Sequence, residues 1–182
     1  MSDAPSGLDL RSTIRSIPDF PKPGIMFRDI TPLLLDVRAF REAVRRMAEP
    51  YAVGDVDVVV GAESRGFIFG APIALALGAG FVPVRKKGKL PAETTAVTYD
   101  LEYGTDTLEM HTDAVSRGTR VLMVDDLLAT GGTMAASCEM VEKAGGTIVG
   151  VEFLIELAFL GGRAKLAQYP VRTQIVYDDE SP

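Results

Sequence analysis

Hydrophobic runs alternate with amphipathic stretches along most of the chain. Four short hydrophobic runs are expected to be buried strands, at residues 56–60, 81–84, 120–124 and 148–155. Three longer stretches carry hydrophobic residues at helical spacing, at residues 37–48, 64–78 and 134–144. This alternation of strand and helix predicts an α/β fold in which helices cover a mainly parallel sheet.

The expected helices carry start and stop signals. Asp36 stands where its carboxylate can accept hydrogen bonds from the first free N–H groups of a helix, and Pro50 follows the expected end of that helix. Gly78 and the pair Gly145-Gly146 stand where the other two helices should stop, because glycine readily adopts the left-handed conformation found there. These signals fix the expected boundaries.

Two stretches depart from the alternation. Residues 8–17 are expected to form a short helix, and the prolines that follow hold the chain in an ordered loop. Residues 94–112 contain two β-prone pieces around Glu102-Tyr103-Gly104, which predicts a hairpin-like excursion of the kind that often serves as a flexible lid. No repeat or long linker divides the chain, so a single domain over residues 1–182 is expected.

Composition narrows the classes of partner. The chain has 19 Lys and Arg against 25 Asp and Glu, a net charge of −6, so it lacks the bulk attraction of general nucleic-acid or anionic-membrane binders. Any anion site must therefore be a local cluster. Cys138 is the only cysteine, no secretory signal is visible, and the longest apolar stretch, residues 70–84, is interrupted and shorter than the ~20 residues of a membrane-spanning helix. A cytoplasmic protein without nucleic-acid or membrane partners is expected.

The most informative chemistry follows the expected strand at residues 120–124. Asp125 and Asp126 should lie at the carboxyl end of that strand, where open α/β sheets bind ligands. Residues 129–133 then supply hydroxyls, glycines and free N–H groups at a helix start, which suits a phosphate. Two carboxylates would repel a phosphate unless a hydroxyl-bearing sugar or a divalent cation separates them, so the expected ligand is a sugar phosphate. The alternative is that the acids merely end a strand and the glycines merely turn the chain.

A second cluster is cationic. Arg85, Lys86, Lys87 and Lys89 fall within five residues of an otherwise acidic chain, which indicates a clamp for diphosphate, with a solvated surface loop as the alternative. Arg65 stands at an expected helix start, where its planar guanidinium could hold phosphate oxygens. Neither the dinucleotide fingerprint Gly-x-Gly-x-x-Gly nor a Gly-Lys-Ser/Thr phosphate loop occurs.

The stretch Val121 to Thr133 resembles the phosphoribosyl-diphosphate motif of the type I phosphoribosyltransferase family. Further blocks match purine members in the right order: Ile17 to Pro21 with Pro23-Gly24, Phe27 to Ile30, Glu63 to Phe67, Arg85 to Pro91 and Leu101 to Gly104. The resemblance implies the family fold, with an N-terminal hood at about residues 1–35 and a lid at about residues 94–112. It also implies Mg²⁺ as cofactor, a homodimer, and phosphoribosyl transfer from 5-phosphoribosyl 1-diphosphate to adenine, giving AMP and diphosphate.

The same resemblance assigns a role to each candidate residue. The hood would bind adenine through Met26 and Arg28, with Phe27 in support, and Tyr103 of the lid would cover the ribose. The catalytic residues would be Glu102, Asp125 and Asp126, with Asp125 a possible metal contact. The 5-phosphate would be held by Ala129, Thr130, Gly131, Gly132 and Thr133. The diphosphate would be held by Arg65, Arg85, Lys86 and Lys89, in part from a partner subunit.

Two alternatives stay open beside this function. The first is the same reaction with another purine base, although Ala129 stands where enzymes for 6-oxopurines usually carry an aspartate. The second is a purine-responsive regulatory protein that keeps the phosphate site. Such regulators usually carry a basic DNA-binding segment, which the length and charge of this chain do not provide.

Overall fold

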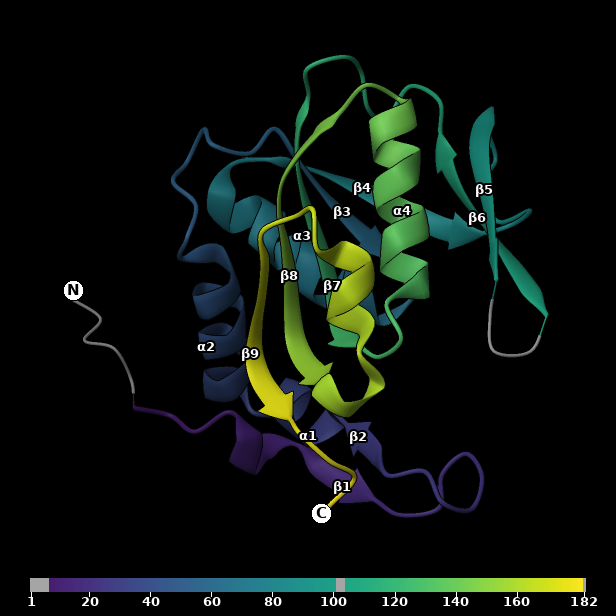
Figure 1. Cartoon of the computed structure of the whole chain (residues 1–182). Helices are drawn as coiled ribbons and strands as arrows, with labels where there is room; N and C mark the ends of the chain where they lie inside the picture. The colour runs from purple at the N-terminus through teal and green to yellow at the C-terminus, as the bar shows by residue number, and fades with distance from the viewer. Residues whose placement is uncertain (1–6, 101–103, 182) are drawn as a thin grey trace.

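A seven-stranded sheet lies at the centre of the computed structural model, which describes residues 7–100 and 104–181 (Figure 1). The strand order is β5-β6-β4-β3-β7-β8-β9. Five strands are parallel: β3 (Val58–Ala62), β4 (Gly80–Lys86), β7 (Arg120–Leu128), β8 (Thr147–Leu157) and β9 (Val171–Tyr177). The hairpin of β5 (Thr94–Asp100) and β6 (Thr105–His111) extends the sheet antiparallel beyond β4.

Helices cover both faces of this sheet. α2 (Val37–Ala48) and α3 (Arg65–Leu77) lie on one face, and α4 (Gly132–Lys143) lies on the other with the 3₁₀ segment η3 (Gly162–Leu166) (Figure 1). Adjacent strand residues alternate between the two cores: Val59 and Leu122 pack with α2 and α3, whereas Val60 and Met123 pack with α4. This arrangement confirms the predicted α/β class with a mainly parallel sheet.

The predicted start and stop signals act as expected. The Asp36 carboxylate caps α2 by accepting from the backbone N–H groups of Arg38 at 2.8 Å and Ala39 at 3.4 Å. Gly78 ends α3 in the left-handed conformation, with φ of 65°. Because these signals are local in sequence, the helix boundaries could be read without knowledge of tertiary contacts.

The N-terminal segment differs from expectation. Residues 8–17 do not form one helix; a 3₁₀ turn, η1 (Arg11–Thr13), is followed by strand β1 (Arg15–Ile17). β1 pairs antiparallel with β2 (Phe27–Asp29) in a separate two-stranded sheet, and the short helix α1 (Thr31–Leu35) follows. Pro18 disfavours helix at the residue before it, and pairing with β2 satisfies the extended backbone instead.

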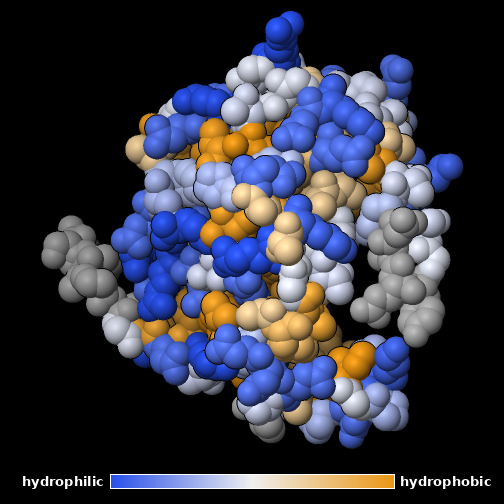
Figure 2. Space-filling view, in the orientation of Figure 1, coloured by the Kyte–Doolittle hydropathy of each residue, from blue (hydrophilic) through white to orange (hydrophobic). Residues whose placement is uncertain are grey.

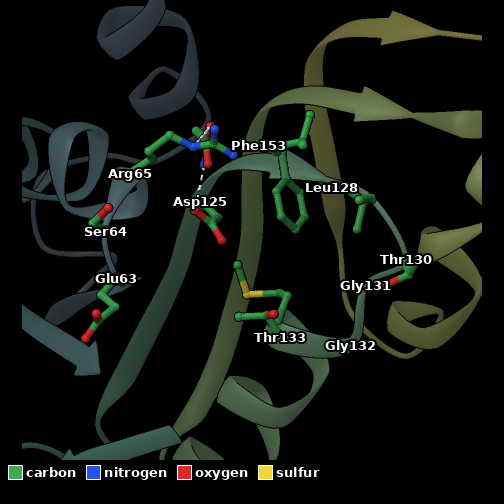
Figure 3. A pocket seen from close by; sticks show the side chains of 14 residues that line it. Glu63, Ser64, Arg65, Asp125, Leu128, Thr130, Gly131, Gly132, Thr133 and Phe153 are labelled. Carbon is green, nitrogen blue, oxygen red and sulfur yellow. Dashed lines mark hydrogen bonds and ion pairs between the residues drawn. The ribbon is translucent and has the colours of Figure 1, made fainter. Parts of the chain in front are cut away.

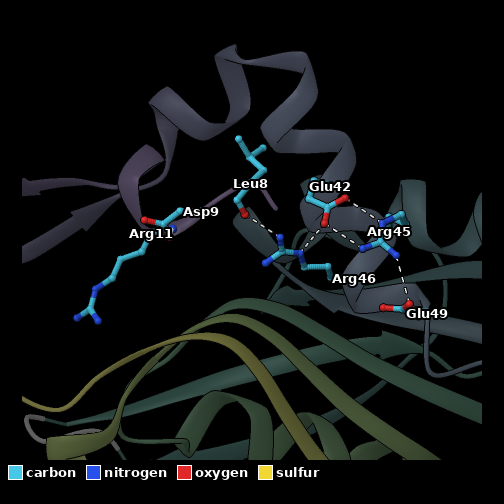
Figure 4. Close-up of polar contacts among 7 residues, drawn as sticks. All are labelled: Leu8, Asp9, Arg11, Glu42, Arg45, Arg46 and Glu49. Carbon is cyan, nitrogen blue, oxygen red and sulfur yellow. Dashed lines mark hydrogen bonds and ion pairs between the residues drawn. The ribbon is translucent and has the colours of Figure 1, made fainter. Parts of the chain in front are cut away.

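The beginning of the described chain is tied to α2 through Glu42 (Figure 4). This buried carboxylate accepts hydrogen bonds from Arg45 at 2.9 Å and from Arg46 at 2.6 Å. Arg46 also donates to the carbonyl oxygen of Leu8 at 2.7 Å. The network therefore compensates a buried negative charge while it holds the N-terminal segment against the helix.

The surface carries no large continuous hydrophobic area on the face drawn in Figure 2, where hydrophobic residues form small groups between hydrophilic ones. Leu35 and Leu75 are the most exposed large hydrophobic side chains of the described residues, at 88% and 83%. In the described part of the chain, no helix has the length and apolar character required to cross a membrane.

Candidate active site

A cleft of about 440 Å³ opens at the carboxyl ends of β3 and β7, the edge at which α/β sheets bind ligands (Figure 3). Three segments of chain meet there: the turn after β3, the end of β7 with the loop into α4, and β8. The lining residues are Glu63, Ser64, Arg65, Asp125, Asp126, Leu127, Leu128, Ala129, Thr130, Gly131, Gly132, Thr133, Met134 and Phe153. Arg65, both acids and the whole predicted phosphate loop are thus in one cavity.

The two acids of the cleft lie near one cation. Asp126 is buried, and its carboxylate pairs with the Arg65 guanidinium, at 2.7 Å between Nε and Oδ2. The Asp125 carboxylate accepts the backbone N–H of Asp126 at 2.9 Å. Burial, and then the charge of Asp126, raise the pKa of Asp125 well above its usual range. Burial also raises the pKa of Asp126, against the opposing effect of Arg65. The site concentrates negative charge where a ligand with hydroxyl donors or developing positive charge would be stabilised.

The phosphate loop is shaped by glycine contacts that the sequence did not reveal. Gly131 has φ of 75°, and a Cβ there would lie 2.5 Å from the carbonyl oxygen of Gly162. A Cβ on Gly162 would in turn lie 2.1 Å from the carbonyl oxygen of Ala129. The loop and the start of η3 therefore touch backbone to backbone, which only glycine allows. This contact fixes the loop that leads into the N-terminus of α4.

The base of the lid is joined to the same helix start. The hydroxyl of Tyr99, on β5, lies 3.1 Å from the Thr133 hydroxyl. Register pairs Tyr99 with Asp106 across the hairpin, in agreement with the predicted excursion at residues 94–112. Glu102 and Tyr103, to which the family resemblance assigns a catalytic and a covering role, lie outside the described residues.

The cationic cluster is bound to Glu63, an acid that lines the cleft and that had no role in the sequence prediction. The Glu63 carboxylate accepts from the Arg85 guanidinium at 3.2 Å, from the backbone N–H of Lys86 at 3.0 Å, and from the Lys89 ammonium. Burial acts to raise the pKa of Glu63, but these cationic and N–H donors outweigh it and lower the pKa. The Lys86 ammonium pairs with Asp106 at 2.9 Å. The position of Glu63, directly after a buried strand, was the available signal.

The hood residues lie beside the cleft and outside its lining. The Phe27 ring is the nearest to it, with the Arg65 guanidinium 5.7 Å from the ring centroid. The side chain of Arg28 does not point to the cleft: its guanidinium is stacked on Tyr177 and bonded to Ser16 and Ser181. No described contact joins Met26 to the cleft residues.

Fold and cleft together define a class of protein, and sequence comparison places the chain in it. Residues 33–176 match the family description "Phosphoribosyl transferase domain", and the chain belongs to this family. Within the family, the chain is similar to the adenine phosphoribosyltransferase of Roseiflexus sp. (strain RS-1). The two are 58% identical over 169 residues, which cover 93% of this chain and 98% of the relative.

Solved structures agree with this placement. The crystal structure of adenine phosphoribosyltransferase from Thermoanaerobacter pseudethanolicus superposes with a TM-score of 0.87 at 54% identity, covering 92% of this chain and 98% of that one. The enzyme from Saccharomyces cerevisiae, complexed with an imino-altritol bisphosphate and adenine, gives a TM-score of 0.85 at 43% identity, covering 91% and 96%. The type I phosphoribosyltransferase fold expected from the sequence is therefore confirmed.

Proposed function

We propose that the chain transfers the phosphoribosyl group of 5-phosphoribosyl 1-diphosphate to adenine, forming AMP and diphosphate. One observation carries this function most directly: Asp125 and Asp126 lie in the carboxyl-terminal half of β7, in the same cleft as the glycine loop at the start of α4. Acids that hold ribose hydroxyls next to a backbone site for phosphate are what a ribose 5-phosphate requires. The high identity to adenine phosphoribosyltransferases supports the choice of base.

The loop of residues 129–133 is the proposed 5-phosphate site. Its N–H groups and hydroxyls meet the N-terminal end of the α4 dipole, which favours negative charge. The rigid contact between Gly131 and Gly162 sets the position of this phosphate and so of the anomeric carbon.

The acidic pair is the proposed stabiliser of the transition state. Loss of diphosphate leaves positive charge on the ribose ring, and carboxylates in a partly dry cleft stabilise it more strongly than water would. Burial raises the pKa of Asp126, and the Arg65 guanidinium at 2.7 Å opposes this by favouring the charged carboxylate. Burial and the charge of Asp126 raise the pKa of Asp125, and hydrogen bonds donated by ribose hydroxyls would favour its ionised form against these effects.

Diphosphate is the proposed ligand of Arg65, Arg85, Lys86 and Lys89. Arg85 and Lys89 now face Glu63, which lines the cleft, so their charges stand at its edge. Arg65 lies inside the cleft and would serve both Asp126 and the leaving group. Mg²⁺ fits this chemistry, because it binds phosphates and hydroxyls of a substrate together with one or two carboxylates, and Asp125 would be the carboxylate that contacts it. When bound it would neutralise charge on the diphosphate.

Adenine is the proposed ligand of the hood, about residues 1–35, through Met26, Phe27 and the backbone of Arg28, since the Arg28 guanidinium is bonded to Ser16 and Ser181. The lid, about residues 94–112, would close over it, with Glu102 exchanging a proton with the imidazole ring of the base and Tyr103 excluding water. Ala129 leaves the phosphate loop without the carboxylate expected for a 6-oxopurine, which supports adenine. A homodimer and a cytoplasmic location remain predictions from the family resemblance.

A variant assay tests the function and the acidic pair together. Purified protein with adenine, 5-phosphoribosyl 1-diphosphate and Mg²⁺ is expected to form AMP and diphosphate in equal amounts. Asp125→Asn with Asp126→Asn should remove most of the turnover, by about 10²-fold or more, and leave the far-ultraviolet circular dichroism unchanged. Asp57→Asn, which breaks a pair with Arg120 at the opposite edge of the sheet, is the matched control and should retain activity. No product from the parent, or a double variant within a few fold of it, would refute the assignment.

A further inference from the structure

The hood hairpin is built apart from the main sheet. Among the described residues, β1 and β2 form hydrogen-bonded ladders with each other and with no strand of the seven-stranded sheet. Arg15 and Asp29 pair across this hairpin at 2.6 Å, which holds its two strands together but does not join it to the body. The position of β2 relative to the cleft therefore depends on side-chain contacts and on the chain that continues from β2 into the buried residues Ile30 and Leu33.

Arg28, in the middle of β2, makes the longest-range polar contact of this hairpin. Its side chain is only 4% exposed, which is unusual for a charged residue. Its guanidinium donates at 2.5 Å to the carbonyl oxygen of Ser181, a residue 153 positions away, and at 2.5 Å to the Ser16 hydroxyl. It also stacks on the Tyr177 ring, with 3.8 Å from Cζ to the ring centroid.

The far partner in this contact is the end of the chain. Tyr177 is the last residue of β9 and is itself buried. Beyond it, the Asp179 carboxylate accepts the backbone N–H of Ser181 at 2.9 Å, a turn that presents the Ser181 carbonyl to Arg28. Asp179 and Glu180 also place negative charge near the buried guanidinium, which otherwise loses hydration. The C-terminal clamp, residues 177–181, thus matches Arg28 in shape, hydrogen bonding and charge.

The neighbour of Arg28, Phe27, lies beside the cleft and faces one of its lining residues. The Phe27 ring faces the Arg65 guanidinium at 5.7 Å, and Arg65 pairs with Asp126 at 2.7 Å. In a strand, adjacent side chains point to opposite sides, so fixing Arg28 on one side fixes where Phe27 stands on the other. A continuous set of contacts thereby joins the C-terminus to the acidic pair.

We propose that the C-terminal clamp is a positioning element for the base site: by holding Arg28 it fixes β2 and so the place of the Phe27 ring beside Arg65. Arg28 is then a positioning residue whose guanidinium acts through the backbone of β2, and this inference rests on the proposed function of the hood. None of the clamp residues lines the cleft that contains the phosphate loop. Loss of the clamp should therefore weaken adenine binding and spare phosphoribosyl diphosphate.

The test separates the two substrates. A chain that ends at Tyr177 loses Asp179, Glu180 and Ser181 but keeps every described strand. Arg28→Lys keeps the positive charge but removes the planar guanidinium group. Both variants are expected to raise the KM for adenine about tenfold, equivalent to about 1.4 kcal/mol of binding free energy. Both should leave the KM for 5-phosphoribosyl 1-diphosphate within about twofold. Arg120→Lys, which alters a guanidinium pair with Asp57 far from the hood, is the control and should change neither constant.

Two results would refute the positioning role of the clamp. An unchanged adenine KM in the shortened chain, whatever its melting temperature, would leave the segment with a purely structural role. Equal increases for both substrates would indicate general loosening of the fold. If Arg28→Lys does not fold, the shortened chain decides alone. Absence of AMP formation by the unaltered protein would refute the proposed function itself, which distinguishes that failure from failure of the clamp.

Discussion

Glu152 gives the protein a pH-dependent stability that a single substitution should remove. Its side chain is fully buried on β8, where the carboxylate accepts from the Tyr51 hydroxyl at 3.1 Å. Arg172 lies at 3.5 Å and the Gln174 amide at 3.5 Å, so both additional partners are long. Burial therefore outweighs these contacts and raises the pKa of Glu152 from 4.5 to about 7.

The sign and size of the effect follow from linkage. Between these two pKa values the folded chain binds more protons at Glu152 than the unfolded chain, so the free energy of unfolding falls as pH rises. A shift of about 2.5 units at 1.36 kcal/mol per unit amounts to about 3 kcal/mol, lost mostly between about pH 5 and about pH 8. Glu152→Gln cannot ionise. Relative to the parent, it should gain about 2 to 3 kcal/mol over that interval.

Urea unfolding of the parent and of Glu152→Gln at about pH 5 and at about pH 8, at fixed protein concentration, measures this difference in the free energy of unfolding. Glu156→Gln on the same strand is the matched control. The Arg163 guanidinium lowers the pKa of Glu156, so its contribution is complete above the unfolded pKa, and this variant should differ from the parent by the same amount at both pH values. A difference between Glu152→Gln and the parent that stays constant, or that shrinks as pH rises, would refute the assignment of a raised pKa to Glu152.

Three further predictions concern the site. Gly131→Ala should reduce affinity for phosphoribosyl diphosphate at least about tenfold, because its Cβ would meet the Gly162 carbonyl oxygen at 2.5 Å; steady-state KM values test this, and an unchanged KM would contradict it. Glu102→Gln should lower turnover by about 10²-fold or more with little change in AMP binding, and Glu102→Leu should be worse; an unchanged turnover number would remove the proton-transfer role. Calorimetry should find weak Mg²⁺ binding without substrate and stronger binding with it, whereas tight binding without substrate would contradict a metal carried by the diphosphate.

Features that depend on local sequence were predictable. Asp36 and Gly78 marked helix ends through hydrogen bonds and dihedral angles that involve only their neighbours in the chain. Asp125 and Asp126 could be placed at a ligand-binding edge because the four residues before them, Val121 to Val124, are all hydrophobic, although β7 continues to Leu128, beyond the expected end at residue 124.

Features that depend on distant contacts were not predictable in this way. β9 was not foreseen: it pairs with β8 and is buried at only some of its positions. The environment of Arg28 depends on residues 153 positions away, so neither its burial nor its partner could be read from its surroundings in sequence. The need for glycine at 131 comes from the backbone of Gly162, whereas sequence reasoning had ascribed it to the approach of a phosphate. In each case the missing information was a tertiary contact.

A base-competition assay tests the central claim most directly. The protein, 5-phosphoribosyl 1-diphosphate and Mg²⁺ are incubated with adenine, hypoxanthine, guanine, xanthine and uracil, singly and as a mixture, and the nucleotide products are separated. AMP should be the dominant product, with kcat/KM for adenine at least about 10²-fold above that for any other base, since a site built to hydrogen-bond one pattern of polar groups rejects the others. Comparable or faster formation of another nucleotide, or no nucleotide from any base, would contradict the account.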